Sequence, residues 1–199
     1  MEKDIGVQVT KNLKPSAHCS KAAGRATAVL GQLMKNFHYR DRHIFVKLYI
    51  QYVRPHLEFS SPAWAPWLEG DKAMLEKVQQ KAVKMVSGLR GRTYEEKCAE
   101  LGLETLEKRR DKQDMAEVYR DVTDQHGPNL FTRAAAERVI RTTAAADPTN
   151  LRKSYARTEI RRNFFTIRAV DKWNNLPKEV KLAPDQKAFK RALEKEWKN

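Results

Sequence analysis

The chain has 199 residues, of which 39 are Lys or Arg and 25 are Asp or Glu, so its formal net charge is +14 at pH 7. No apolar run approaches the roughly 20 residues that a helix needs to cross a bilayer, which excludes a membrane-spanning protein. The opening residues lack the apolar stretch of a secretory signal, so we expect none. Two cysteines, Cys19 and Cys98, cannot build a disulfide framework, so we expect an intracellular protein.

The first elements are a short strand and a long helix. Ile5, Val7 and Val9 alternate with small or polar residues, which is the period of a strand. After a turn that ends at Pro15, apolar residues recur at helical spacing. We therefore predict a helix over Ser16–Asn36.

A second helix is predicted from about Arg40 to Val53. It is expected to end before Pro55, whose ring removes a backbone donor and restricts the preceding residue. Apolar residues cover most of its circumference, which is typical of a buried helix. The narrow polar stripe that remains is basic, because Lys47 and Arg54 follow Arg40 at intervals of seven residues.

The next segments are an aromatic loop and a third helix. Residues 55–70 form the predicted loop, in which Trp64 could either stack on a base or pack against the core. Asp71 is expected to cap a helix over Lys72–Ser87. The side of this helix opposite its apolar residues carries three lysines at helical spacing: Lys77, Lys81 and Lys84.

The second half of the chain has clearer helix signals than strand signals. Thr93 begins a capping box that opens a short helix to Leu101. The next helix is expected from about Thr105 to Asp124, with its carboxylates on a solvated surface. The remaining predictions are a soft boundary at 142–149, a short strand over Ser154–Ile160, a helix over Arg161–Trp173, and a last helix over Gln186–Trp197 capped by Asp185.

No motif for catalysis or metal binding is present. The chain has no Gly-Lys-Ser/Thr triplet for a phosphate loop, no His-Glu-x-x-His and no Gly-x-Ser-x-Gly. Its five histidines and two cysteines lack the spacing of a metal site. We therefore expect no catalytic residue, no metal ion and no cofactor on this chain.

The positive charge lies at the two ends of the chain. Residues 1–91 carry a net charge of +8, residues 92–149 carry −2, and residues 150–199 carry +8. Clustered Lys and Arg attract polyanions, and they are the electrostatic footprint expected of a nucleic-acid-binding protein. The charge pattern therefore favours nucleic acid as the partner.

Six short segments stand out in order along the chain. They are FHYRD (37–41), VRPHLEF (53–59), LEKVQQKA (75–82), LGLETLEKRR (101–110), RNFF (162–165) and WNNLP (173–177). Taken together, their order and spacing resemble the region beyond the palm of non-LTR retrotransposon reverse transcriptases of the LINE and jockey-like kind. The resemblance extends over nearly the whole chain.

The resemblance implies the end of the palm, then the thumb, then a helical C-terminal extension. The thumb helices are expected to clasp a template–primer duplex of RNA or RNA–DNA, and the palm and fingers of the parent polymerase are the other expected partners. The family's polymerase centre is an aromatic-x-Asp-Asp turn that holds two Mg²⁺ ions, and this chain contains no Asp-Asp pair. The chain alone is therefore expected to be non-catalytic, to start after the catalytic turn, to bind no membrane and to act in the nucleus.

The expected fold is mainly α: a helical bundle with a short N-terminal β-strand or hairpin and a small C-terminal helical extension. The expected parts are a hairpin remnant (1–15), a thumb-like helical domain (16–125), a connecting segment (126–153) and a basic extension (154–199). The residues expected to contact nucleic acid are Lys21, Arg25, Lys35, Arg40, Lys47, Arg54, Trp64, Lys77, Lys81, Lys84, Arg161, Arg162 and Arg168.

Two other functions fit the same sequence. The chain could be a helical protein-interaction module that docks to an acidic partner or to the catalytic half. Its basic amphipathic helices could also lie on a membrane surface. The membrane alternative is weaker, because the apolar sides of the helices are needed for a common core.

Overall fold

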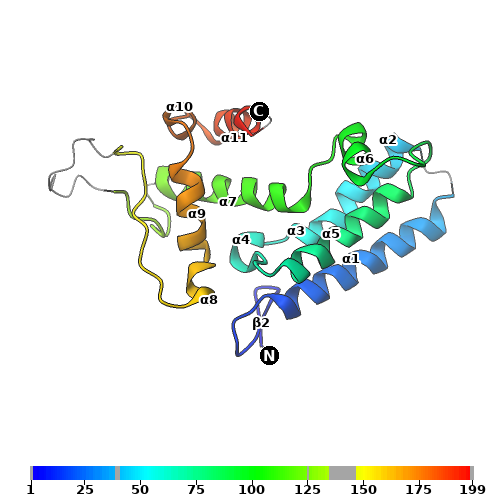
Figure 1. The fold of residues 1–199 in the computed structure, drawn as a ribbon, viewed down its shortest axis with the longest axis horizontal. Helices are drawn as coiled ribbons and strands as arrows, with labels where there is room; N and C mark the ends of the chain where they lie inside the picture. The colour runs from blue at the N-terminus through cyan, green and yellow to red at the C-terminus, as the bar shows by residue number, and fades with distance from the viewer. Residues whose placement is uncertain (1, 39–40, 125, 135–146, 198–199) are drawn as a thin grey trace. The chain divides into compact units, whose positions relative to one another are not determined.

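The fold is mainly helical, with a short antiparallel hairpin at the N-terminus, which confirms the predicted class (Figure 1). The structure is a computed structural model that describes residues 2–38, 41–124, 126–134 and 147–197. The chain divides into two compact units, Met1–Arg110 and Asp111–Asn199, which we call unit 1 and unit 2.

The N-terminal residues form a two-stranded hairpin with a two-residue turn inside the segment predicted as one strand. β1 (Glu2–Asp4) pairs with β2 (Val7–Val9). Ile5 and Gly6 form the two-residue turn with φ of 41° and 91°, the left-handed geometry that favours glycine in such turns. Ile5 therefore lies outside the strand, 87% exposed, and its assignment to the strand was wrong.

Two helices form the base of unit 1. α1 (Ser16–Asn36) has the predicted bounds, and it packs against α5 (Glu69–Lys84). The hydroxyl of Ser16 donates to the Asp71 carboxylate at 2.7 Å, which joins the first turns of the two helices. Asp71 is therefore a buried residue inside α5 and not its cap, because the helix begins at Glu69.

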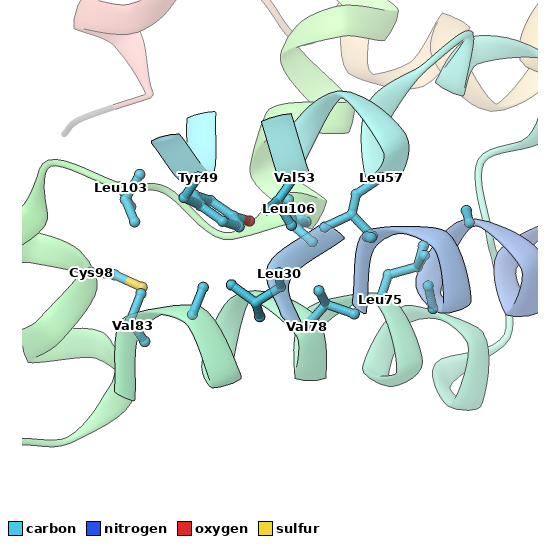
Figure 2. Packing of buried hydrophobic residues seen from close by; sticks show 14 of the residues in the cluster. Leu30, Tyr49, Val53, Leu57, Leu75, Val78, Val83, Cys98, Leu103 and Leu106 are labelled. Atoms are coloured by element: carbon cyan, nitrogen blue, oxygen red, sulfur yellow. The ribbon is translucent and has the colours of Figure 1, made fainter. Parts of the chain in front are cut away.

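The core of unit 1 is formed by the apolar sides of these two helices and of the segments that pack on them. Leu30 of α1 lies beside Val78 of α5, and Leu57 lies across from Leu75 farther along the same core (Figure 2). Each of these four side chains is at most 3% exposed. At about 1.5–3 kcal/mol for each fully buried aliphatic side chain, this contact is a main source of stability for unit 1.

The second predicted helix continues through Pro55 instead of ending before it. α2 (Arg42–Leu48) leads into a π-helical turn, η1 (Tyr49–Val53), and then into α3 (Arg54–Glu58). The N–H of Arg54 bonds to the carbonyl of Tyr49, five residues earlier. This wider turn carries the chain past a proline that would end a regular helix.

The predicted aromatic loop also contains a helical turn. α4 (Ser61–Trp64) follows Ser60, which has a left-handed φ of 54°. Trp64 is 5% exposed, its indole N–H donates to the Phe59 carbonyl at 2.8 Å, and its ring lies against His18. The loop is therefore shorter than predicted, and Trp64 belongs to the core.

Gln79 of α5 is the centre of a buried hydrogen-bond network in unit 1. Its side-chain carbonyl accepts from the Tyr49 hydroxyl at 2.8 Å. Its amide donates to the Tyr94 hydroxyl at 2.8 Å and to the Glu104 carbonyl at 2.9 Å. The network links the π-turn, α5, α6 (Tyr94–Leu101) and the segment after α6.

We expect Gln79→Leu to lower the free energy of unfolding by about 2–3 kcal/mol, because it leaves the Tyr49 hydroxyl and the Glu104 carbonyl buried without this partner. Urea denaturation followed by circular dichroism measures the change. The matched control is Gln80→Leu at the next, half-buried position, which we expect to change stability by at most about 0.5 kcal/mol. Equal losses for the two variants would contradict the role of the network.

The predicted start and end of the next helix are confirmed. Thr93 and Glu96 form the predicted capping box of α6, and Gly102 ends the helix in the left-handed conformation. α7 (Leu106–Thr123) follows, close to its predicted bounds. Its first residues belong to unit 1 and its remainder to unit 2, so the division between the two units lies inside this helix.

Unit 2 has its own core. Met115, Val118 and Tyr119 of α7 pack with α9 (Phe165–Asn174) and α11 (Gln186–Glu196), and Tyr119 stacks on Phe189. α10 (Lys178–Lys181) joins α9 to α11. Asp185 caps α11 as predicted.

Two predictions in unit 2 were wrong. Residues 154–160 form no strand, because the chain there is irregular until α8 (Glu159–Arg162). The helix predicted over Arg161–Trp173 is broken, because Phe164 is extended and caps α9. The segment predicted as a soft boundary, 142–149, lies mostly outside the described residues.

Two carboxylates of α7 are buried and not solvated as expected. Asp114 forms a two-point ion pair with Arg168 of α9, with distances of 2.9 and 3.0 Å. Asp121 accepts the backbone N–H groups of Leu130 and Phe131, each at 3.0 Å. Both carboxylates therefore hold other segments of unit 2 against α7.

Candidate nucleic-acid interface

The three lysines of α5 form the clearest basic surface in the structure. Lys77, Lys81 and Lys84 are all exposed, while Leu75 and Ala82 on the opposite side are buried. None of the three lysines forms an ion pair with a residue that the structure describes. Their ammonium groups are therefore available to an external anion. We call these three residues the α5 lysine face.

The basic residues of α1 lie on its exposed side, as helical spacing predicts. Arg25 and Lys35 are exposed and Lys21 is half-buried. Lys21 and Arg25 line one pocket together with Lys3 of the hairpin and His56 of α3. Lys35 does not line this pocket.

The basic stripe predicted on the second helix is not continuous. Lys47 is exposed, whereas Arg54 lies beside Glu58 with 3.7 Å between its Nε and the carboxylate. The π-turn between them holds more residues per turn than an α-helix, so the regular seven-residue spacing that predicted one stripe does not hold across it. Arg40 lies outside the described residues.

Arg54 shares Glu58 with a second arginine. Arg109 of α7 makes two hydrogen bonds to the Glu58 carboxylate, and this hydrogen bonding raises the pKa of Arg109. Burial lowers the pKa of Arg54, and the charge of Arg109 adds to that effect. This cluster joins α3 to α7 inside unit 1, so Arg54 is paired within the described residues, unlike the α5 lysine face.

Of the two roles considered for Trp64, base stacking and packing against the core, the structure has the second. Its ring is buried and its N–H is bonded within the chain. Base stacking needs an exposed aromatic face. Trp64 is therefore removed from the candidate interface.

The arginines predicted near the C-terminus have three different environments. Arg161 is exposed and its guanidinium lies 5.2 Å from the centre of the Phe164 ring. Arg162 is also exposed, and its Nε donates to the Ala156 carbonyl at 3.3 Å. Arg168 is held by Asp114, so only the first two present charge at the surface of unit 2.

The sequence interpretation missed His18, Lys3 and His56, which share the pocket with Lys21 and Arg25. His18 precedes Lys21 by three residues, so helical spacing could have placed it beside the α1 stripe. Lys3 and His56 carry no such signal, because the hairpin and α3 reach α1 only through tertiary packing.

The next features of the described residues are the cysteine of α1 and the possible metal ligands. Burial raises the pKa of Cys19 to about 12, which leaves its thiol protonated and unreactive at neutral pH. In the part of the chain that the structure describes, no three His, Cys, Asp or Glu side chains come together in the manner of a metal site. None of the helices there has the length and apolar character to cross a membrane.

No protein-family model, no curated protein and no solved structure matches this chain. What it binds is therefore inferred from the chemistry of its surface and from the resemblance of its sequence segments.

Proposed function

We propose that this chain binds the phosphates of an RNA or RNA–DNA duplex, as the thumb-like, non-catalytic part of a retrotransposon reverse transcriptase. The observation that carries the proposal is the α5 lysine face, where Lys77, Lys81 and Lys84 are exposed together. The net charge of +14 supports it, because a strongly positive protein attracts polyanions such as nucleic acid. The order of the six sequence segments supplies the link to the reverse transcriptases.

The spacing of the α5 lysine face suits a nucleic-acid strand. Lys77 and Lys84 are seven residues apart, which is about 10 Å along a helix axis at ~1.5 Å per residue. One strand of a duplex presents a phosphate about every 3.4 Å of its axis. Three lysines over that length can therefore meet about three successive phosphates if the helix follows the duplex axis.

Recognition is expected to depend on the backbone of the duplex and not on its bases. Contacts to phosphate position a protein without reading sequence. The tryptophan that sequence analysis offered for base contact is buried in unit 1. The α5 lysine face should therefore bind duplexes of different sequence with similar affinity.

The affinity is expected to fall steeply with salt. If the three lysines of α5 with Lys21 and Arg25 neutralise about five phosphates, a plot of log K against log salt has a slope of about −4 to −5. Filter binding of a 20-base-pair RNA–DNA hybrid at a series of KCl concentrations measures it. A flat response would contradict phosphate binding.

A second candidate function has one specific observation in its favour. Ile44 of α2 and Tyr52 of the π-turn are 51% and 54% exposed, so both present apolar surface to solvent. In this alternative the chain is a protein-interaction module, and these two residues contact an acidic partner or the catalytic half. A stable monomer that shows no binding to the duplex at low salt would favour this alternative.

A further inference from the structure

A pocket in unit 1 gathers positive and hydrogen-bond-donating groups from three elements. It has a volume of about 220 Å³ and is lined by Lys3 of β1, by His18, Lys21 and Arg25 of α1, by His56 of α3 and by Phe59. No carboxylate belongs to its described lining. Lys3, Lys21 and Arg25 form no ion pair with any residue in the described ranges. The pocket therefore holds three permanent cations without a counter-charge.

His18 adds a fixed donor to this pocket. Its side chain is buried, and its Nδ1 accepts the backbone N–H of Gln8 at 3.1 Å. The neutral ring consequently carries its hydrogen on Nε2, because one nitrogen must donate when the other accepts. Within the described chain, no residue accepts a hydrogen bond from this Nε2–H.

The surroundings of His18 keep this arrangement stable. Its ring is tilted against Trp64 with 4.5 Å between the ring centres. Burial lowers the pKa of His18, and the charges of Lys21 and Arg25 lower it further. The ring therefore stays neutral at physiological pH, as a donor that adds no repulsion to the three cations.

The last feature of the pocket is an exposed aromatic ring at its edge. Phe59 is 58% exposed, and its ring reaches within 3.2 Å of the place where a β-carbon on Gly6 would stand. Glycine at this turn lets the ring lie against the hairpin. A planar group bound beside the cations would have this ring to pack on.

We propose that this pocket binds a phosphate monoester of a nucleotide, with the phosphate among Lys3, Lys21, Arg25 and His18 and the base on Phe59. A dianion suits three cations and a neutral donor better than the single charge of an internal phosphodiester. The volume is below the 300–1,000 Å³ of sites for drug-sized ligands, so it suits a phosphate while the base stays outside. The inference deepens the proposed function, since Lys21 and Arg25 serve both, and points to the phosphorylated end of a strand.

The test compares oligonucleotides that differ only in their end. A four-nucleotide strand with a 5′-phosphate is expected to bind the full chain at least about 10-fold more tightly than the same strand with a 5′-hydroxyl, measured by fluorescence anisotropy. Inorganic phosphate is expected to compete and to shift the imidazole NMR signals of His18. If adenosine monophosphate binds as tightly as the 5′-phosphorylated strand, the ligand is a free nucleotide. If the strand binds more tightly, the ligand is the end of a strand. Both results support a site for a phosphate monoester.

Two double variants separate this pocket from the duplex surface. Lys21→Ala with Arg25→Ala is expected to abolish the preference for the 5′-phosphate. Lys77→Ala with Lys81→Ala removes the same charge from α5, and it should weaken duplex binding while keeping that preference. If the double variant Lys21→Ala with Arg25→Ala unfolds, the single variant Arg25→Gln is used in its place, because Arg25 is exposed.

Equal affinity for the two strand ends would overturn the pocket proposal even if the duplex still bound. The same loss of preference in both double variants would also overturn it, because the effect would then follow net charge and not the pocket. Duplex binding that fails while the 5′-phosphate preference survives would instead overturn the proposed function.

Discussion

Replacing Lys77, Lys81 and Lys84 together by glutamate is expected to lower the affinity for an RNA–DNA duplex by at least about 100-fold near 0.1 M salt. Three phosphate contacts are lost and three like charges take their place. The slope of log K against log salt should fall from about −4.5 to about −2, since about two phosphates remain neutralised. Filter binding over a salt series measures both quantities.

The variant should fold normally, because all three lysines are exposed and form no ion pair within the described residues. Each change is expected to alter the free energy of unfolding by at most about 0.5 kcal/mol. In a matched control, three exposed lysines of unit 2 are replaced by glutamate, which makes the same change in net charge. These are Lys178, Lys187 and Lys190. If the control weakened binding as much as the α5 variant, the α5 lysine face would have no special role.

Removing the carboxylate of Asp114 is expected to destabilise unit 2 strongly. The side chain of Asp114 is 3% exposed and that of its partner Arg168 is 18% exposed. Burial raises the pKa of Asp114, and Arg168 opposes that rise by favouring the charged form. Asp114→Ala leaves the guanidinium without this carboxylate in a poorly solvated place, which typically costs about 3–5 kcal/mol.

A second ion pair between the same helices provides the control. Lys172 of α9 contacts Asp111 of α7, but the lysine side chain is 45% exposed. Lys172→Ala is therefore expected to cost at most about 1 kcal/mol. The double variant Asp114→Ala with Arg168→Met should recover part of the loss, because it removes both buried charges. Urea denaturation compares the three, and an equal loss for Asp114→Ala and Lys172→Ala would contradict a buried pair that holds α7 to α9.

Local signals in the sequence were sufficient for several helices. The bounds of α1, α6 and α11 follow from Pro15, the Thr93 capping box and the Asp185 cap, since each signal acts within one turn of the helix it begins. The exposed lysines of α5 were predicted for the same reason, because helical periodicity decides which side is apolar.

What the sequence could not show depends on partners that are distant along the chain. The burial of Asp114 requires Arg168, which lies 54 positions away. The burial of Trp64 depends on its contact with His18 of α1. The π-turn before Pro55 cannot be read from residue type, because prolines end most helices. Helix propensity and spacing carry no information on these contacts.

The same limit applied to the candidate site. Sequence spacing identified Lys21 and Arg25 as one stripe of a helix, but Lys3 and His56 reach them only when the hairpin and α3 pack on α1. It also included Arg54, which forms an ion pair with Glu58, four residues later in α3, and shares that carboxylate with Arg109 of α7. The basic stripes could be predicted, whereas their assembly into a pocket could not.

Lysine footprinting tests the central claim most directly. The chain is acetylated briefly with and without an excess of RNA–DNA hybrid, and modification of each lysine is measured by mass spectrometry. We predict that the hybrid protects Lys77, Lys81, Lys84 and Lys21 by several-fold, while the exposed Lys187 and Lys190 react at their original rates. Protection that is absent from the α5 lysine face, or that is uniform over all exposed lysines, would contradict the claim that this face grips a duplex.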